Sequence, residues 1–201
     1  MNAIEIQGLT KRYGPITAVD GLDLTVRQGE LFALLGVNGA GKTTTIKMLS
    51  CLTRPDSGDA RLLGRSIVSD AAGVKRCIGV SPQETAVAPN LTARENLALL
   101  CGVHGLSRQE TAARTEELSR ALGLDVLARA ELWDVIRALK GRITVILTTH
   151  YMEEAEALSD RVGVMKDGRL LALGTPEELK AQTGCEKFEE AFIAIVKGAG
   201  K

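Results

Sequence analysis

Residues 31–44 read LFALLGVNGAGKTT, an apolar run that leads directly into a glycine-rich stretch. The continuous apolar segment 31–35 predicts a strand buried on both faces, as is typical of a parallel sheet. The stretch that begins at Gly36 matches the pattern G-x-x-x-x-G-K-[ST], and residues 44–52 then favour a helix. Strand, glycine-rich loop and helix in this order form the context that a phosphate-binding loop requires.

The residue types of this loop suit the binding of a nucleoside triphosphate. Glycines let the backbone turn tightly, so that successive N–H groups point at phosphate oxygens at a helix N-terminus. The Lys42 ammonium reaches the β- and γ-phosphates, and the Thr43 hydroxyl ligates Mg²⁺. The candidate nucleotide-binding residues are therefore Gly36, Asn38, Gly39, Ala40, Gly41, Lys42, Thr43 and Thr44.

Composition excludes several classes of protein. The 201 residues include 25 Lys and Arg and 25 Asp and Glu, so the net charge is zero. Such a chain lacks the positive field that non-specific nucleic-acid binding needs, and nucleic acid is not expected as a partner. Its 45% of apolar residues argues against disorder. No apolar run approaches the ~20 residues that span a bilayer, and we expect a soluble, cytoplasmic protein.

The four cysteines are far apart in the sequence and form no C-x-x-C pair. With only two histidines in the chain, they do not complete a zinc ligand set. We expect buried, reduced thiols at Cys51, Cys77, Cys101 and Cys185.

Short strands and helices alternate along the chain. Residues 3–9 and 22–26 alternate apolar and polar side chains, which indicates half-buried strands of an antiparallel sheet. Further strands are expected at 59–63, 77–80, 143–148, 162–165 and 170–173, the last two joined by an Asp-Gly hairpin turn. Capping boxes begin helices at Thr92, Ser107 and Thr175. The pattern predicts an α/β fold with a mostly parallel sheet flanked by helices and a small N-terminal antiparallel sheet.

Three other segments, together with the phosphate loop, resemble the nucleotide-binding subunit of ABC transporters over nearly the whole chain. They are residues 9–21 with Tyr13, residues 80–84 with Gln83, and residues 147–169 with His150. Residues 43–49 and 188–192 resemble the drug- and polyketide-exporter branch. The resemblance implies a P-loop NTPase fold and one nucleotide-binding domain over residues 1–201.

The resemblance also implies ligands, roles and partners. Tyr13 is expected to stack on adenine, which a tyrosine ring face favours by about 1–3 kcal/mol. Gln83 is expected to ligate Mg²⁺ with Thr43, and His150 to contact the γ-phosphate and orient the attacking water. Besides ATP, the implied partners are a membrane permease, which holds the protein at the inner face of the cell membrane, and a second nucleotide-binding domain in a homo- or heterodimer.

The sequence departs from this family in its middle. It contains no LSGGQ-like signature and no Walker B strand ending in Asp-Glu. Residues 122–129, with Asp125, resemble the D-loop that follows Walker B, yet they come directly after the predicted helix 110–121. We interpret the chain as a cassette with an internal deletion and a truncated helical insert at about 84–122. Alternatively, residues 122–125 merely end the insert and the D-loop is lost as well.

A missing Walker B strand has two expected consequences. The strands on either side of the missing one must form hydrogen bonds with each other, because unpaired buried backbone groups cost free energy. The carboxylates that help to hold Mg²⁺ and polarise water are also absent. The candidate functions are thus an exporter ATPase, a module that binds ATP without hydrolysing it, and a deletion product that folds poorly. An ABC protein acting on ribosomes or DNA is disfavoured by the neutral charge.

Overall fold

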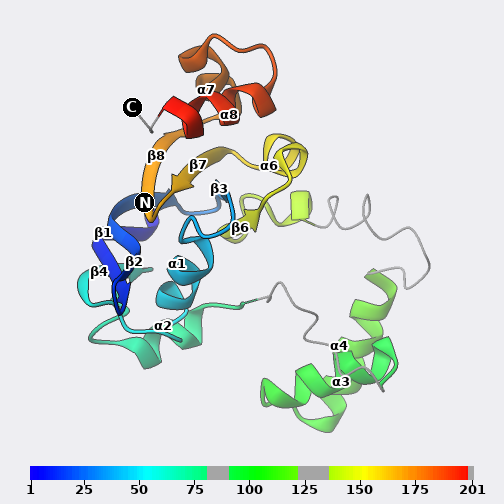
Figure 1. Cartoon of the computed structure of the whole chain (residues 1–201). Helices are drawn as coiled ribbons and strands as arrows, with labels where there is room; N and C mark the ends of the chain where they lie inside the picture. Colours follow the sequence, from blue (N-terminus) through cyan, green and yellow to red (C-terminus); the bar gives the residue numbers. More distant parts are fainter. Residues whose placement is uncertain (81–90, 122–135, 199–201) are drawn as a thin grey trace. The chain divides into compact units, whose positions relative to one another are not determined.

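The computed structural model describes residues 1–80, 91–121 and 136–198 (Figure 1). The chain divides into two units, of which unit 1 comprises residues 1–79 and 139–201 and unit 2 residues 80–138. In the described part of both units, no helix is long and apolar enough to cross a membrane.

Unit 1 contains an antiparallel sheet near the N-terminus. It is built from β1 (Asn2–Tyr13), β2 (Ile16–Arg27), β4 (Ser57–Leu62) and β5 (Arg65–Ser66), in the order β2-β1-β4-β5. All neighbouring strands run antiparallel. The alternating patterns at 3–9 and 22–26 therefore predicted the correct kind of sheet, although both strands extend further than the patterns do.

The second sheet of unit 1 surrounds the apolar run that opens the phosphate loop. β3 (Leu31–Gly36) is buried along its whole length and pairs in parallel with β6 (Val145–Thr149) and β7 (Arg161–Lys166). β8 (Arg169–Gly174) pairs antiparallel with β7, which gives the order β6-β3-β7-β8. The predicted mostly parallel sheet is confirmed, and β3 has a hydrogen-bonded partner on each edge.

The helices of unit 1 cover the two faces of β3. They are α1 (Lys42–Leu49), α2 (Ala71–Cys77), α6 (Met152–Leu158), α7 (Pro176–Thr183) and α8 (Phe188–Gly198). Phe32 and Leu34 belong to the core that includes α1 and the antiparallel sheet, whereas Ala33 and Leu35 belong to the core formed with α6, α7 and α8. Alternate residues of one strand thus enter two cores, which explains its unbroken apolar sequence.

The expected strand at 77–80 is wrong. Cys77 is the last residue of α2, a helix that the sequence analysis missed, and residues 78–80 form no strand. The side chain of Asp70 caps this helix by accepting a hydrogen bond from Gly73 N–H at 3.0 Å. The short apolar run at 77–80 suggested a strand, but such a run by itself does not distinguish a strand from the end of a helix. The cap at Asp70 stabilises the helix that is observed.

The cysteines are free thiols, but the expectation that all are buried is wrong. Cys101 is buried, Cys51 and Cys185 are partly buried, and Cys77 is exposed. Cys77 is the last residue of α2 and does not lie in the expected strand.

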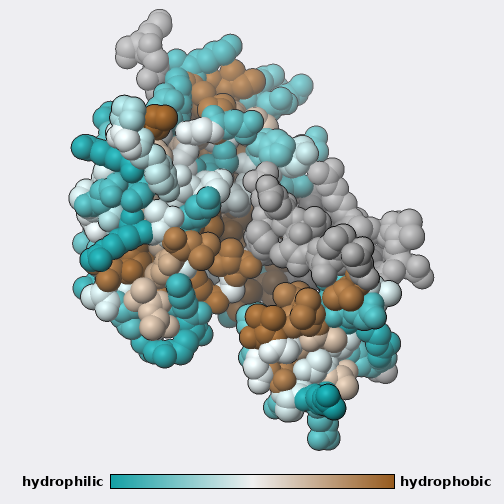
Figure 2. Space-filling view, turned by 60° about the horizontal axis from the view of Figure 1, so that its bottom comes forward, coloured by the Kyte–Doolittle hydropathy of each residue, from teal (hydrophilic) through white to brown (hydrophobic). Residues whose placement is uncertain are grey.

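Unit 2 contains a pair of helices, α3 (Ala93–Val103) and α4 (Arg108–Ala121). Both begin where the capping boxes predict. Thr92 and Glu95 exchange the two hydrogen bonds of the box on α3, and Ser107 and Glu110 do so on α4. On α3, the apolar residues Leu99, Leu100 and Val103 are 50%, 45% and 73% exposed. Figure 2 shows apolar side chains gathered on the surface of this helical unit.

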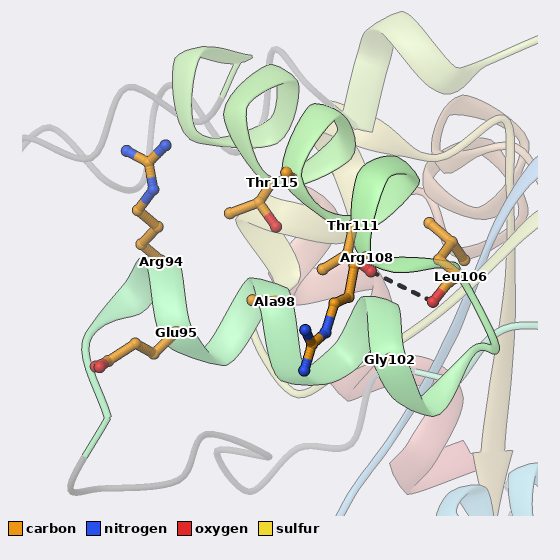
Figure 3. A pocket seen from close by; sticks show the side chains of 9 residues that line it. Arg94, Glu95, Ala98, Gly102, Leu106, Arg108, Thr111 and Thr115 are labelled. Atoms are coloured by element: carbon orange, nitrogen blue, oxygen red, sulfur yellow. Dashed lines mark hydrogen bonds between the residues drawn. The ribbon is translucent and has the colours of Figure 1, made fainter.

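A cavity of about 550 Å³ lies between the two helices of unit 2 (Figure 3). Ala98 and Gly102 of α3 and Thr111 and Thr115 of α4 line it. The Thr111 hydroxyl donates a hydrogen bond to the Leu106 carbonyl at 3.5 Å. The Thr115 hydroxyl is buried and has no hydrogen-bond partner among the described residues.

Replacing Thr115 with valine is expected to stabilise the protein by about 1 kcal/mol, because a buried hydroxyl without a partner is costly and valine has nearly the same volume. For a chain of this size the gain corresponds to a rise in Tm of about 2–4 °C. Thermal unfolding followed by circular dichroism measures it. Thr111→Val removes a hydroxyl that has a partner and serves as the control, which should not be stabilised. A lower Tm for Thr115→Val would contradict the expectation.

Candidate nucleotide-binding site

The glycine-rich loop joins the buried end of β3 to the first turn of α1. Gly36 ends the strand in close contact with its surroundings: a Cβ atom there would lie 2.5 Å from the Met165 carbonyl oxygen and 2.8 Å from the Ala40 Cβ. No larger residue fits this position without displacing backbone. The loop therefore folds back tightly at the carboxyl end of the central strand, where ligands bind in open α/β sheets.

Two further glycines adopt positive φ angles that other residues rarely accept. Gly39 has φ +82° and faces open space, whereas Gly41 has φ +101° and packs against the Ala18 carbonyl. A Cβ on Gly41 would lie only 2.4 Å from that oxygen. Both conformations are left-handed, and glycine adopts them without steric cost. The glycines thus shape a loop that is closed against β2 and open at Gly39.

The loop leaves a row of backbone donors without acceptors. Ala40 N–H donates to the Val37 carbonyl at 3.1 Å, and Thr45 N–H donates to the Gly41 carbonyl at 2.9 Å. Among the described residues, no acceptor is found for the N–H groups of Gly39, Gly41, Lys42, Thr43 and Thr44. Donors at the N-terminus of a helix attract anions, and several consecutive ones are suited to phosphate oxygens.

The Lys42 ammonium lies over the same loop. It donates hydrogen bonds to the Gly36 carbonyl at 2.6 Å and to the Val37 carbonyl at 3.1 Å. Burial lowers the pKa of Lys42 below its ordinary value, because the charged form is partly removed from water. A phosphate group entering the loop would supply the negative charge that these two neutral carbonyls do not.

The hairpin between β7 and β8 also contacts the loop. Gly168 N–H donates to the Ala40 carbonyl at 3.1 Å, and the Gly168 carbonyl accepts from Asp20 N–H at 2.9 Å. Arg169 binds the Asp20 carboxylate through Nε at 2.8 Å and Nη2 at 2.6 Å. The Asp-Gly sequence predicted this hairpin turn, but nothing in the sequence indicated that the turn would hold the phosphate loop.

His150 lies at the same edge of the sheet as the loop. Thr149 is opposite Leu35 in the parallel pairing of β6 with β3, so His150 follows at the level of Gly36. Its side chain is exposed, and its ring centroid is 4.1 Å from that of Tyr151. The Thr149 hydroxyl accepts a hydrogen bond from Tyr151 N–H at 3.0 Å and donates to Glu154 at 2.9 Å. These bonds set the direction in which the chain leaves β6.

Tyr13 belongs to the antiparallel sheet, at the end of β1. Its side chain is 47% exposed, and the Lys11 ammonium lies 5.5 Å from the ring centroid. Asn38 and Thr43 are also exposed, on the loop and in the first turn of α1. Gln83 and Asp125 lie outside the described residues. The structure thus brings the loop and His150 to one sheet edge and places Tyr13 on the neighbouring sheet.

The site residues fit a bound nucleotide on three observations. A Cβ at Gly36 or Gly41 would collide with neighbouring atoms, five loop N–H groups have no acceptor among the described residues, and a lysine with a lowered pKa adjoins them. For Mg²⁺, the Thr43 hydroxyl is the one predicted ligand that lies in the described part of the chain. A phosphate-containing ligand therefore suits this loop.

Comparison with known proteins places the chain in a family. The ABC transporter family model matches residues 19–141. The daunorubicin resistance ATP-binding protein DrrA3 of Streptomyces coeruleorubidus is 37% identical over 241 aligned residues, covering 99% of this chain and 75% of that protein. The Nod factor export ATP-binding protein I of Burkholderia lata is 37% identical over 229 aligned residues, with 92% and 75% covered.

Solved structures agree in fold. An ATP-binding subunit of an ABC transporter superposes with a TM-score of 0.82 at 24% identity, covering 96% of this chain and 99% of the other. The fold, the matching family model and the similar proteins all indicate the same family. The chain belongs to the ABC transporter family, as an ATP-binding subunit in the branch of the drug-resistance and Nod factor export proteins.

Proposed function

We propose that this chain binds Mg-ATP at residues 36–44 as the ATP-binding subunit of an ABC exporter, and that it does not hydrolyse ATP by itself. The observation that carries the proposal is that the N–H groups of Gly39 and of residues 41–44 have no acceptor among the described residues and lie next to the Lys42 ammonium. This arrangement sits at the end of a fully buried strand, which keeps the donors oriented before a ligand arrives.

Each predicted residue has a role in this proposal. The loop amides and Lys42 bind the phosphates, Tyr13 stacks on adenine, and Thr43 ligates Mg²⁺ together with Gln83. His150 contacts the γ-phosphate from the end of β6, and Asp125 belongs to the D-loop. The Mg²⁺ ion would neutralise the charge of the β- and γ-phosphates when bound.

The lack of hydrolysis rests on the proposed internal deletion. The alignment with DrrA3 spans 241 positions whereas this chain has 201 residues, so at least 40 positions lie opposite a gap in this chain. This length difference supports the loss of the segment that carries the signature and Walker B. Without the Walker B glutamate, no carboxylate in the expected sequence context is left to polarise the attacking water.

The proposed partners are a membrane permease and an intact ATP-binding subunit. Paired with an intact subunit, the phosphate loop of this chain could face the partner's signature and complete one composite site. A dimeric ATP-binding cassette in a post-hydrolysis state, bound to ADP and phosphate, superposes with a TM-score of 0.74 at 20% identity. That structure supports the fold on which such pairing would depend. Through the permease, the chain would lie at the inner face of the cell membrane.

Purified protein is expected to bind Mg-ATP in a calorimetric titration and to release phosphate no faster than its Lys42→Ala variant. The reason is that the binding groups are present whereas the catalytic carboxylates are missing. A phosphate-release assay on both proteins measures this. Rapid turnover that disappears in Lys42→Ala would reject the non-hydrolysing module and favour an exporter ATPase. The absence of any heat with Mg-ATP would reject the nucleotide site itself.

A further inference from the structure

The Lys11 side chain is mostly buried and contacts both a carboxylate and an aromatic ring. Its side chain is 14% exposed, and its ammonium forms an ion pair with Asp56 at 3.0 Å. The same ammonium lies 5.5 Å from the centroid of the Tyr13 ring, within the range of a cation–π interaction. Lys11 and Tyr13 are two residues apart on β1, so the ion pair and the ring belong to one short stretch of strand.

Asp56 is itself held by three contacts with β1. Its Oδ1 accepts from Lys11 at 3.0 Å and its Oδ2 accepts from Arg12 N–H at 2.6 Å. The backbone N–H of Asp56 donates to the Thr10 carbonyl at 2.9 Å. The hydrogen bonds from Arg12 N–H and from Lys11 hold the pKa of the Asp56 carboxyl below its ordinary value, because they favour the charged form. Residues 10–12 of β1 are thus hydrogen-bonded to Asp56, the residue directly before β4.

The hydrogen bonds to Asp56 hold the Lys11 ammonium over one face of the Tyr13 ring. A cation at one face of an aromatic ring occupies that face and limits the orientations of the ring. A flat ligand can then stack only on the opposite face. Because part of the ring's rotational freedom is already lost, less entropy is lost when a base stacks on it.

We propose that Lys11, held by Asp56, is a positioning residue for Tyr13: it occupies one face of the ring and orders it, so that the adenine of ATP stacks on the other face. The inference rests on the proposed function, since it assumes that ATP binds and that Tyr13 contacts its base. It adds to that function two residues, 45 positions apart, that act through the tyrosine and not on the nucleotide.

The test compares Mg-ATP with Mg-tripolyphosphate, which has the phosphates but no base. Lys11→Met is expected to weaken Mg-ATP binding about three- to tenfold and to leave tripolyphosphate binding unchanged. Asp56→Asn should have a smaller effect of the same kind, and Lys11→Arg should restore ATP affinity. Lys180→Met is the matched control, because it breaks another lysine–carboxylate pair of 3.0 Å, between Lys180 of α7 and Glu156 of α6. Calorimetric titration gives each Kd.

The outcomes separate this inference from the proposed function. Equal weakening of both ligands in Lys11→Met would show a general structural effect and overturn the inference. Unchanged ATP affinity in Lys11→Met, with weakened affinity in Tyr13→Ala, would overturn the inference alone. If Tyr13→Ala changes nothing, or if the wild type binds neither ligand, the proposed base contact or the whole site fails, and the inference fails with it. Unchanged tripolyphosphate binding by each variant also reports that its phosphate loop is folded.

Discussion

Lys42→Ala is expected to weaken the binding of Mg-ATP by roughly ten- to a hundredfold. Hydrogen bonds from a charged ammonium to phosphate oxygens contribute about 1.5–3 kcal/mol, and the partial burial that lowers the pKa of Lys42 strengthens such contacts. The ammonium already lies over the loop, 2.6 Å from the Gly36 carbonyl, so it needs little movement to reach a bound phosphate. Calorimetric titration with Mg-ATP measures the change in Kd.

Lys47→Ala provides the matched control for this prediction. Lys47 lies on the same helix, α1, but its side chain is exposed, and within the described residues its ammonium makes no hydrogen bond. Its removal should change the Kd less than twofold. If both variants lose affinity equally, the effect comes from the overall charge of the helix and the assigned role of Lys42 is wrong.

Gly41→Ala is expected to lower the stability of the fold by about 3 kcal/mol. A left-handed conformation costs a non-glycine residue about 1–2 kcal/mol, and an added methyl group in a packed site costs about 1–3 kcal/mol more. Both terms apply here, because Gly41 has φ +101° and its Cβ would lie 2.4 Å from the Ala18 carbonyl oxygen. Thermal unfolding should show a decrease in Tm of about 6–12 °C.

Gly39→Ala isolates the conformational part of this effect. Gly39 also has a positive φ, +82°, but a Cβ there would meet nothing within 4 Å. The decrease in Tm should therefore be about 2–8 °C. Equal decreases in the two variants would mean that the close approach of Gly41 to β2 does not constrain the loop.

Features that depend on neighbouring residues could be predicted from the sequence. The capping boxes at Thr92, Ser107 and Thr175 begin helices as expected, because both hydrogen bonds of a box form within four residues. The Asp-Gly turn between β7 and β8 is equally local. For the same reason, the order of strand, glycine-rich loop and helix around residues 31–49 was predicted correctly. The helix at 71–77 also has a local signal, the Asp70 cap. It was not predicted, because the apolar residues at 77–80 were interpreted as a strand.

The supports of the candidate site could not be predicted in this way. Gly168 contacts the loop at Ala40, and Asp56 contacts Lys11, across long intervals of sequence. Neither interval contains a pattern that specifies the contact. The roles of Gln83 and Asp125 remain predictions from the resemblance, since both lie outside the described residues.

The sequence by itself determined the strand, glycine-rich loop and helix of the candidate nucleotide site, the family and the class of fold, because strand burial, glycine turns and helix caps are encoded within a few consecutive residues. Only the tertiary structure decided that β3 has a strand on each edge, that the Gly168 turn holds the loop, and that Lys11 and Asp56 flank Tyr13. The physical reason is that these contacts join segments distant in the chain. They form only when burial of the apolar strands brings the two sheets together.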